Sequence, residues 1–398
     1  MHPSEEIKGV KSNILKNKKI VLAVTGSIAA IESIKLAREL IRHDAEIIPV
    51  MTKASTQIIH PDALWFATGK KPKTTLTGQT EHVSYCGKIQ DSADLLLISP
   101  CTANTISKIA HGIDDTSVTT FATTAIGSKT PILIVPAMHL SMYSHNIIKE
   151  NIEKCKQNQI EFISPHIKGS KAKLASIDEI VANVIKKTNK NDLNEKKMLI
   201  IGGSNIQPID DIRYISNFSS GKTGLFLAKK AYLRGAKVLL MMGHNNLEIP
   251  KYIKTRNFTT IKKLTKLLKE ENLSNFDIII NCAAISDYIP EKTKGKIKSG
   301  KKNLKIKMNN APKIIPKIKK MSSKSTIVAF KAEEKKENIE KKSMELLKKY
   351  DIDYVVGNHI SAFNKDQNEI SIFDRQGKID TKKDRKEKLA DHILDKIK

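Results

Sequence analysis

Short apolar runs alternate with segments of helical periodicity along the 398-residue chain, and this alternation restricts the fold more than any other feature. In the first half, the runs predicted as strands are Ile20–Val24, Glu46–Met51, Leu95–Ser99, Ile132–Pro136 and Ile160–Ser164. After the first run, apolar residues recur at helical spacing from Ile28 to Ile41. Repeated β–α alternation predicts a parallel, doubly wound sheet. Ligands in such sheets bind at the carboxyl ends of the strands.

A polar segment, residues 190–197, is predicted to be an interdomain linker. We therefore expect one α/β domain over residues 1–189 and a second over residues 198–398. The strands predicted in the second are Met198–Ile201, Lys237–Met241, Asp277–Cys282, Thr326–Phe330, Tyr354–Val356 and Ile370–Phe373. Between the third and the fourth of these strands, the segment Glu291–Asn303 is rich in lysine and glycine. It is either a disordered loop or a loop that orders on an anionic ligand.

The composition excludes several classes of protein. No apolar run approaches the length of a membrane span, and Met1–Lys19 lacks the apolar region of a secretory signal, so we expect a cytoplasmic protein. The four cysteines show neither C-x-x-C pairing nor zinc-ligand spacing. The net charge of +27 is compatible with nucleic-acid binding, but the lysines are dispersed and lack interleaved aromatic residues. Solvated lysines on helix faces are the favoured interpretation.

A polar string precedes the first helix of the second half. It reads Arg-Tyr-Ile-Ser-Asn-Phe-Ser-Ser-Gly-Lys-Thr-Gly over residues 213–224, and it follows a strand and a Gly-Gly turn. The backbone N–H groups, two hydroxyls and the Lys222 ammonium before this helix suit an anion. The spacing is not that of a P-loop. The alternative is an ordinary connection between a strand and a helix.

Four strands of the first half end in polar or ligand-type groups. The first strand is followed by Gly26-Ser27-Ile28, the second by Thr52, and the third by the segment Ser99–Thr105. The fourth ends in Pro-Ala-Met-His, which contains Met138 and His139. Because the carboxyl ends of parallel strands meet at one edge, these groups predict a ligand site. The convergence of the four ends is more specific than any one of them.

These motifs resemble a known family. The string R-Y-I-S-N-x-S-S-G-K-x-G is similar to that of phosphopantothenate–cysteine ligases. The Gly-Ser-Ile-Ala turn, the Pro-x-Thr-Ala-Asn-Thr string and the Pro-Ala-Met box resemble those of flavin-dependent phosphopantothenoylcysteine decarboxylases. Together they indicate the bifunctional family of coenzyme A synthesis, in its archaeal-type branch. The resemblance implies a flavodoxin-like first domain that binds FMN and a Rossmann-like second domain that binds CTP.

For the first domain, the resemblance implies that His82, expected in a loop, is the catalytic histidine. It also implies that Met138 and His139 bind substrate, with His139 replacing the family's usual Asn as the anchor of the substrate carboxylate. The family's lid cysteine is missing from residues 165–173, which leaves the proton donor unassigned. Cys155 is interpreted as an ordinary thiol. The FMN-binding residues implied are Gly26, Ser27, Ile28, Thr52, Ser99, Thr102, Asn104 and Thr105.

For the second domain, the resemblance implies that Asn217 is catalytic and holds the activated acyl group, and that Asn217 and Lys222 bind substrate. Asp287 is expected at a strand end, and a helix is expected to begin at Pro312. Lys342, Lys348 and Lys349 are alternatives for the helix lysines. Mg²⁺ is expected through the CTP phosphates, with no protein ligand assigned. The CTP-binding residues implied are Asn281, Cys282, Ala283, Asp287, Lys296, Pro312, Lys313, Ile314, Ile315, Phe330 and Lys349.

The function implied is CTP-dependent ligation of 4′-phosphopantothenate to L-cysteine through an acyl-cytidylate, followed by FMN-dependent decarboxylation to 4′-phosphopantetheine. The resemblance also implies a homo-oligomer, with trimeric flavin domains and dimeric ligase domains. Neither nucleic acid nor a membrane is an expected partner. Three alternatives stay open: another flavoenzyme on the same N-terminal fold, a ligase with a non-catalytic flavin-binding or assembly module, and a basic nucleic-acid-binding protein.

Overall fold

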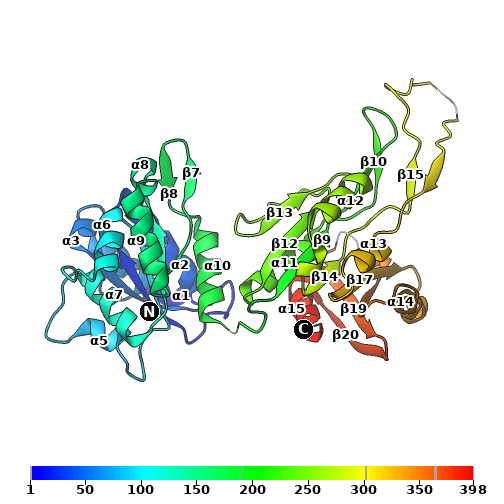
Figure 1. Cartoon of the computed structure of the whole chain (residues 1–398). Helices are drawn as coiled ribbons and strands as arrows, with labels where there is room; N and C mark the ends of the chain where they lie inside the picture. The colour runs from blue at the N-terminus through cyan, green and yellow to red at the C-terminus, as the bar shows by residue number, and fades with distance from the viewer. Residues whose placement is uncertain (1, 190, 301–302, 363–364, 398) are drawn as a thin grey trace. The chain divides into compact units, whose positions relative to one another are not determined.

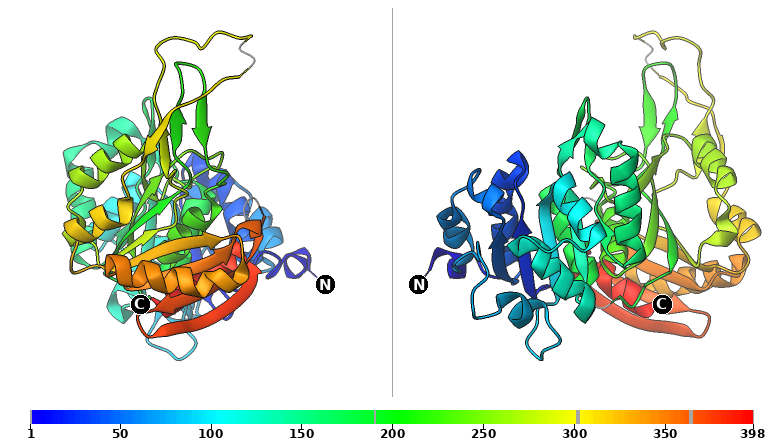
Figure 2. Two further views of the ribbon diagram at one scale, coloured as in Figure 1. Left: turned by 90° about the vertical axis from the view of Figure 1, so that its right-hand side faces the viewer. Right: turned by 60° about the vertical axis from the view of Figure 1, so that its left-hand side comes forward.

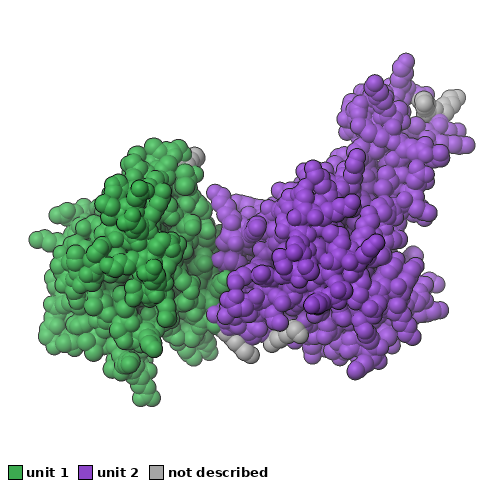
Figure 3. Space-filling model, in the orientation of Figure 1, with its two compact units in different colours: residues 1–190 green, residues 191–398 purple. Residues whose placement is uncertain are grey.

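A computed structural model describes the chain except residues 1, 190, 301–302, 363–364 and 398. The chain divides into two compact units, residues 1–190 and residues 191–398 (Figures 1 and 3). Each unit contains its own sheet and its own hydrophobic core. The two units are therefore described separately.

The first unit is built on a five-stranded parallel sheet in the order β2–β1–β3–β4–β6. These strands span β1 (Lys19–Val24), β2 (Glu46–Met51), β3 (Leu95–Cys101), β4 (Ile132–Pro136) and β6 (Glu161–Phe162). The order 2-1-3-4-5 is that of flavodoxin-like folds, so the predicted fold class is confirmed for this half. The last predicted strand, Ile160–Ser164, is reduced to two residues.

Helices cover both faces of this sheet (Figure 1). One face carries α2 (Ser33–Arg42), α4 (Pro61–Thr68) and α10 (Ile177–Thr188). The other carries α5 (Glu81–Cys86), α6 (Ala103–His111), α7 (Ser117–Ser128) and α9 (Asn146–Gln157). Both faces of β1 are buried, as expected for a continuous apolar run inside a doubly wound sheet. The short elements are α1 (Pro3–Glu6), η1 (Ile28–Glu32), α3 (Lys53–Thr56) and α8 (Leu140–Tyr143).

A small second sheet extends the carboxyl end of β4. It consists of β5 (Met138–His139), β8 (Lys171–Lys173) and β7 (His166–Lys168), in the antiparallel order β5–β8–β7. Residues 165–173, where the family's lid cysteine is missing, therefore form a hairpin. The hairpin pairs directly with the Pro-Ala-Met-His segment.

The second unit contains an eight-stranded sheet in the order β13–β12–β9–β14–β17–β18–β19–β20. Its first six strands are parallel and follow the order 3-2-1-4-5-6, so the predicted Rossmann-like class is confirmed. Two antiparallel strands close one edge. The strands are β9 (Lys197–Gly202), β12 (Lys237–Met242), β13 (Lys254–Asn257), β14 (Ile278–Asn281), β17 (Thr326–Glu333), β18 (Tyr354–His359), β19 (Gln367–Asp374) and β20 (Gly377–Arg385).

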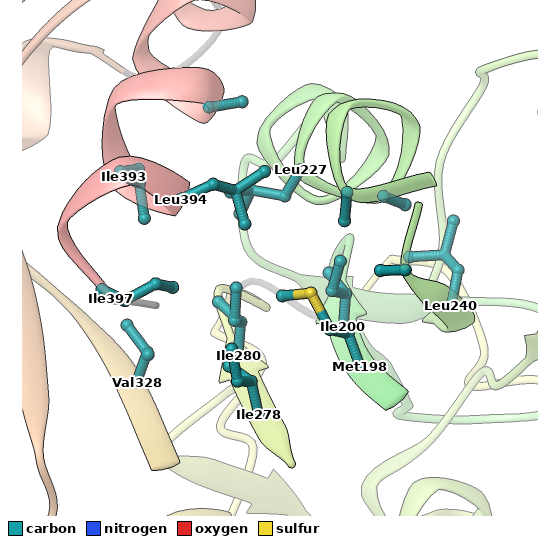
Figure 4. Packing of buried hydrophobic residues seen from close by; sticks show 14 of the residues in the cluster. Met198, Ile200, Leu227, Leu240, Ile278, Ile280, Val328, Ile393, Leu394 and Ile397 are labelled. Carbon is teal, nitrogen blue, oxygen red and sulfur yellow. The ribbon is translucent and has the colours of Figure 1, made fainter. Parts of the chain in front are cut away.

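Two helices, α11 (Lys222–Leu233) and α15 (Lys386–Lys396), pack together on one face of this sheet (Figure 4). Leu227 of α11 and Leu394 of α15 are fully buried in the same apolar cluster as Ile200 and Ile280. The other face carries α12 (Ile261–Glu270), α13 (Ile314–Met321) and α14 (Lys336–Tyr350). The short turns η2 (Leu273–Asn275) and η3 (Ile360–Ala362) lie in connections.

The segment expected to be a linker is partly packed. Leu193 is 1% exposed and belongs to the core cluster of the second unit. Its backbone N–H donates to the carbonyl of Arg234, and Asp192 pairs with the Arg234 guanidinium at 2.6 Å. The packed part of this unit therefore begins before Met198. A single apolar residue among polar neighbours is enough to anchor the segment.

Two antiparallel ribbons project from the second unit (Figures 1 and 2). The first pairs β10 (Ile206–Pro208) with β11 (Tyr214–Ser216), and the second pairs β15 (Tyr288–Pro290) with β16 (Met308–Asn310). The lysine-rich stretch, Glu291–Asn303, lies between β15 and β16, and its residues 301–302 are outside the described part of the chain.

Candidate active sites

In the first unit, the carboxyl ends of β1 and β3 meet at the point where the strand order reverses. Thr25 joins them: its Oγ1 donates to the carbonyl of Pro100 at 2.9 Å and accepts the backbone N–H of Thr102 at 3.0 Å. The backbone carbonyl of Ala137, which follows β4, accepts a hydrogen bond from the Ser27 hydroxyl at 3.3 Å. Three of the predicted strand ends are thus linked at the edge where ligands bind in doubly wound sheets.

Three of the predicted FMN-binding residues are helix N-caps at this edge. Ser27, Thr52 and Thr102 begin η1, α3 and α6, and each side-chain oxygen accepts a backbone N–H of its own helix. Three helix N-termini at the same edge of the sheet suit a phosphate. A Cβ added to Gly26 would lie 2.6 Å from the Cβ of Ala54, so only glycine fits this turn. The remaining predicted residues comprise exposed Ile28 and Asn104 and buried Thr105, whose Oγ1 lies 3.2 Å from that of Thr102.

Two predicted residues leave buried polar atoms without a partner. Ser99 is 0% exposed, and neither its Oγ nor the Nδ1 of His82 has a hydrogen-bond partner among the described residues. Buried polar groups are nearly always paired, so such atoms are typical of a site completed by a ligand. His82 was expected in a loop, which is wrong: it lies in the helix α5. Its neighbour Glu81 accepts the backbone N–H and the hydroxyl of Thr77, and the backbone bond holds the pKa of Glu81 below its usual value.

His139 is the residue expected to anchor the substrate carboxylate. It is exposed, and it is the N-cap of α8. Its Nδ1 accepts the backbone N–H of Ser141 at 3.3 Å and lies 2.7 Å from the Ser141 hydroxyl. In this arrangement Nδ1 acts as the acceptor, so the other ring nitrogen, Nε2, can contact a ligand.

The hairpin β7–β8 brings a lysine to His139. In the ladder between β5 and β8, His139 pairs with Lys171 and Met138 pairs with buried Ala172. Opposite residues in an antiparallel pair project on the same face. The side chains of His139 and Lys171 therefore project from the same face of this small sheet. Cys155, by contrast, is 1% exposed, and burial raises its pKa to about 11.

The second unit has a pocket of about 380 Å³ at its own switch point, between β9 and β14. The helix α11 begins at this pocket, with Gly221 as its N-cap at φ 77°, a left-handed conformation that favours glycine. A Cβ on Gly224 would lie 2.9 Å from the Cα of Gly202, so α11 packs tightly on the end of β9. The pocket is lined by Gly203, Asn217, Ser219–Gly224, Cys282–Ile285, Asp287, Phe330–Ala332, Asn358, Asn368 and Lys386.

The structure brings together several predicted ligase residues. Asn217, Lys222, Cys282, Ala283 and Phe330 all line this pocket. The Nδ2 of Asn217 donates to the carbonyl of Ala284 at 3.2 Å. The Lys222 ammonium lies 2.6 Å from the carboxylate of Asp366. The predicted anion-binding string is therefore at the switch point, and Lys222 is the first residue of the helix rather than a residue before it.

Other predicted ligase residues lie at the margin of the pocket or away from it. Asp287 lines it but was expected at a strand end, which is wrong, since β14 ends at Asn281. The Asp287 carboxylate pairs with Lys313 at 2.5 Å. The helix expected from Pro312 begins instead at Ile314, with Lys313 as N-cap.

The remaining predicted residues do not line the pocket. Asn281 is 9% exposed and its side chain accepts the N–H of Ala283. Ile315 packs on the hydrophobic core. Lys349 lies in the last turn of α14. This helix begins at the carboxyl edge of the sheet and runs away from it, so its last turn is far from that edge.

Lys296 lies in the ribbon beyond β15, where a second hollow of about 550 Å³ is lined by five lysines together with Glu291, Thr293 and four apolar residues. Its neighbour Ile297 is held by the turn of the β10–β11 hairpin. The fully buried Asp210 carboxylate accepts the N–H of Ile297 at 3.1 Å, and Arg213 donates to its carbonyl at 2.7 Å. Asp210 and Arg213 also pair with each other at 2.6 Å. These contacts fix the backbone next to Lys296.

Sequence reasoning missed three residues of the pocket: Asn358, Asn368 and Lys386. Asn358 is the residue before the last of the parallel strand β18, and its place near a strand end was a usable signal. Lys386 lies in the charged run Asp-Arg-Lys-Glu-Lys, where nothing separates it from a solvated lysine. Within the described part of the chain, no helix is long and apolar enough to cross a membrane, and no group of His, Cys, Asp and Glu is arranged to hold a metal ion.

Two doubly wound units, each with ligand-type groups at its switch point, define a two-domain α/β enzyme. Residues 9–189 match the Flavoprotein family, and residues 193–398 match the C-terminal domain of the DNA/pantothenate metabolism flavoprotein family. The chain belongs to the family of the coenzyme A biosynthesis bifunctional protein CoaBC.

Curated relatives with that name match the full length of the chain. The protein of Thermococcus kodakarensis is 42% identical over 402 residues, covering 100% of this chain and 99% of the relative. That of Methanocaldococcus jannaschii is 40% identical over 408 residues, covering 100% and 98%. Among solved structures, the C-terminal domain of a CoaBC protein is 26% identical, covers 52% of this chain and 96% of its own, and has a TM-score of 0.44.

The chain is therefore a bifunctional enzyme of coenzyme A biosynthesis, with a flavoprotein decarboxylase unit and a phosphopantothenate–cysteine ligase unit. The predicted family and its archaeal-type branch are confirmed, because both of these relatives are archaeal. The two alternatives without this pair of activities, another flavoenzyme and a nucleic-acid-binding protein, are not supported. Nor is a ligase with a non-catalytic N-terminal module.

Proposed function

We propose that the second unit uses CTP to activate 4′-phosphopantothenate as an acyl-cytidylate, and that L-cysteine then displaces CMP to form an amide. The observation that carries this proposal is the pocket at the β9/β14 switch point, where the N-terminus of α11 and the Lys222 ammonium converge. Backbone N–H groups and the positive end of a helix favour phosphate groups.

The chemistry requires one anion to attack another. The substrate carboxylate attacks the α-phosphorus of CTP, and pyrophosphate leaves. Lys222 and the N-terminal turn of α11 offset the repulsion and stabilise the charge that builds up on phosphorus. We propose that Mg²⁺ accompanies the CTP phosphates, where it would offset part of their negative charge.

Asn217 is positioned to orient the activated acyl group. Its side-chain amide lies on the pocket wall and donates to the Ala284 carbonyl. Turning that amide toward the substrate would offer an N–H to the acyl oxygen, on which charge develops when the cysteine amine attacks. Lys296 lies in the ribbon held by Asp210. We propose that the ribbon carries this ammonium to the triphosphate.

For the first unit, we propose that the flavin is FMN. The residues present fit it: three N-caps, Ser27, Thr52 and Thr102, surround a glycine turn, and Ser99 Oγ and His82 Nδ1 are buried without partners. The bound flavin supplies the electron acceptor and donor that cysteine decarboxylation needs without a net redox change.

The protein residues of this site bind the substrate and move its protons. A neutral imidazole at His82 is a base suited to the cysteine thiol near pH 7. The Nε2–H of His139 donates to the substrate carboxylate, and the ammonium of Lys171, its partner in the β5–β8 ladder, supplies the positive charge. Carbon dioxide release removes that negative charge, so the product should be held less tightly.

The full-length protein tests both proposals in one reaction. Given CTP, Mg²⁺, 4′-phosphopantothenate and L-cysteine, it should release pyrophosphate and then carbon dioxide, with FMN bound. ATP in place of CTP should support much less pyrophosphate release. Pyrophosphate release that does not depend on phosphopantothenate would contradict the acyl-cytidylate. A protein that takes up no FMN would contradict the assignment of the flavin.

We propose two domains, residues 1–189 and 198–398, joined by the linker 190–197. Leu193 is buried in the second unit, so a ligase fragment should begin at residue 191. Fragment 191–398 should release pyrophosphate, whereas a fragment from residue 198 should be less stable. Equal stability of the two fragments would show that Leu193 contributes nothing.

We also propose a cytoplasmic homo-oligomer with trimeric flavin units and dimeric ligase units. The support is the exposure of apolar side chains beside the flavin site, where Ile28 is 76% exposed and Ile31 is 50% exposed. Large exposed apolar side chains in one place mark interaction sites. Sedimentation of the full chain and of fragment 1–189 tests the oligomer, and a monomeric fragment 1–189 would contradict the trimer. Cell fractionation tests the location.

A further inference from the structure

Lys386 is a buried cation in the ligase pocket. It is the first residue of α15, it is 8% exposed, and it lines the pocket with Lys222 and Asn358. Burial and the nearby Lys222 ammonium lower its pKa, and the opposing effect of Asp366 is smaller. No ion pair of Lys386 is found among the residues that the structure describes.

The other pocket lysines are compensated. Lys222 pairs with Asp366 at 2.6 Å, and Lys331 pairs with Glu333 at 2.9 Å. A buried charge without a partner is costly, and such charges are normally paired. The N-terminus of α15 adds positive potential at the same place. Lys386 therefore increases the need for an anion in this part of the pocket.

We propose that Lys386 is an anion-binding residue of the ligase pocket and contacts a phosphate group of a bound substrate. The proposal rests on the ligase function assigned to this pocket and deepens it. Both CTP and 4′-phosphopantothenate carry phosphate, so the shared chemistry is a phosphate oxygen and the source is decided by experiment. Lys386 extends the anion site from the N-terminus of α11 to that of α15.

Lys388 provides a matched control, because it lies in the same helix and its side chain is 71% exposed. Binding of CTP and of 4′-phosphopantothenate is measured separately by calorimetry on the full chain. Lys386→Met should weaken the binding of one of these ligands roughly 10- to 100-fold, the range for a lost hydrogen bond to a charged group. The ligand that binds less tightly is the one whose phosphate Lys386 contacts. Lys388→Met should bind both ligands like the parent, and Lys386→Arg should bind more tightly than Lys386→Met.

The stability of the ligand-free protein separates binding from a structural role. Lys386→Met removes a buried charge that has no ion pair among the described residues, so the unfolding temperature of the second unit should be unchanged or higher. A structural lysine predicts the opposite. Lower stability together with unchanged affinity for both ligands would overturn the proposal.

Chemical labelling of the parent protein provides a readout that does not depend on a variant. Acetylation of Lys386 is followed by mass spectrometry, with and without each ligand. Protection by CTP or by 4′-phosphopantothenate is expected at Lys386 and not at Lys388. Protection by neither would overturn the proposal. A parent protein that binds no CTP would instead contradict the proposed ligase function, and phosphopantothenate would still test Lys386.

Discussion

Leu394 offers a test of how the ligase unit is held together. It is fully buried in α15, among the side chains that join this helix to α11 and to the sheet (Figure 4). Because α11 begins at the pocket, with Gly221 as its N-cap, loosening of α15 should reach the site through α11. Leu394→Ala deletes the buried side chain and leaves a cavity.

The expected cost is worked from this burial. A Leu→Ala change at a fully buried position lowers the free energy of unfolding by about 3 kcal/mol, from the transfer of the lost atoms and the cavity together. For a unit of this size, each kcal/mol shifts the unfolding temperature by roughly 2–4 °C. The second unit should therefore unfold roughly 6–12 °C lower than in the parent.

The chain has one tryptophan, Trp65, and it lies in the first unit. Tryptophan fluorescence thus follows the first unit, while circular dichroism follows both units and residual pyrophosphate release after heating follows the second. In Leu394→Ala, the unfolding temperature of the second unit should fall, and the unfolding temperature reported by Trp65 should stay the same.

The control is Lys388→Ala on the same helix, which should change the stability by less than about 0.5 kcal/mol because the side chain is exposed. A shift below about 2 °C in Leu394→Ala would refute the packing argument, since it corresponds to less than roughly 1 kcal/mol. A parallel shift of the Trp65 transition would refute the independence of the two units.

Three further changes test the sites. His82→Asn should abolish carbon dioxide release and leave pyrophosphate release intact; loss of both activities in a folded protein would contradict its assignment to the flavin unit. Asp210→Asn should make residues 291–300 more sensitive to trypsin, because the carboxylate holds the backbone beside Lys296, and an unchanged cleavage rate would show that the contact does not restrain the ribbon. Glu81 has a pKa lowered chiefly by the backbone N–H of Thr77, so its stabilising effect is present above the unfolded-state pKa, about 4.3, and is lost as the pH falls through the lower folded-state value. Glu81→Gln should therefore destabilise the first unit at pH 7, by tryptophan fluorescence, and the difference from the parent should shrink below about pH 4; a difference that persists at low pH would mean that ionisation of Glu81 is not its cause.

Most of the parallel strands were predictable because they are buried on both faces and read as apolar runs. The parallel edge strand β13 was missed, since none of its four residues is buried. The run around Ile20 and that around Met198 became β1 and β9, the central strands at which the strand order reverses in each sheet. The antiparallel strand β20 was missed, since its sequence Gly-Lys-Ile-Asp-Thr-Lys-Lys-Asp-Arg is charged. An edge strand faces solvent and needs no apolar alternation.

Site residues were predictable where the chain itself carries them to a strand end. Ser27 and Thr102 follow their strands directly and cap the next helices. His139 follows β4 as predicted, but its pairing with Lys171 joins distant segments and is not indicated by the sequence around His139. The place of Lys386 in the pocket depends on the antiparallel pairing of β19 and β20 beside β18, which no local pattern reveals.

The pocket of the second unit is lined by residues from Gly203 to Lys386, whereas the flavin edge and its hairpin are complete by Lys173. On a translating ribosome, at about 5–20 residues per second, the roughly 200 residues that separate these two points take about 10–40 s. During that interval the nascent chain can fold its first unit and capture flavin before any nucleotide site exists. Translation that stops short of α15 would therefore leave fragments that hold flavin and cannot ligate.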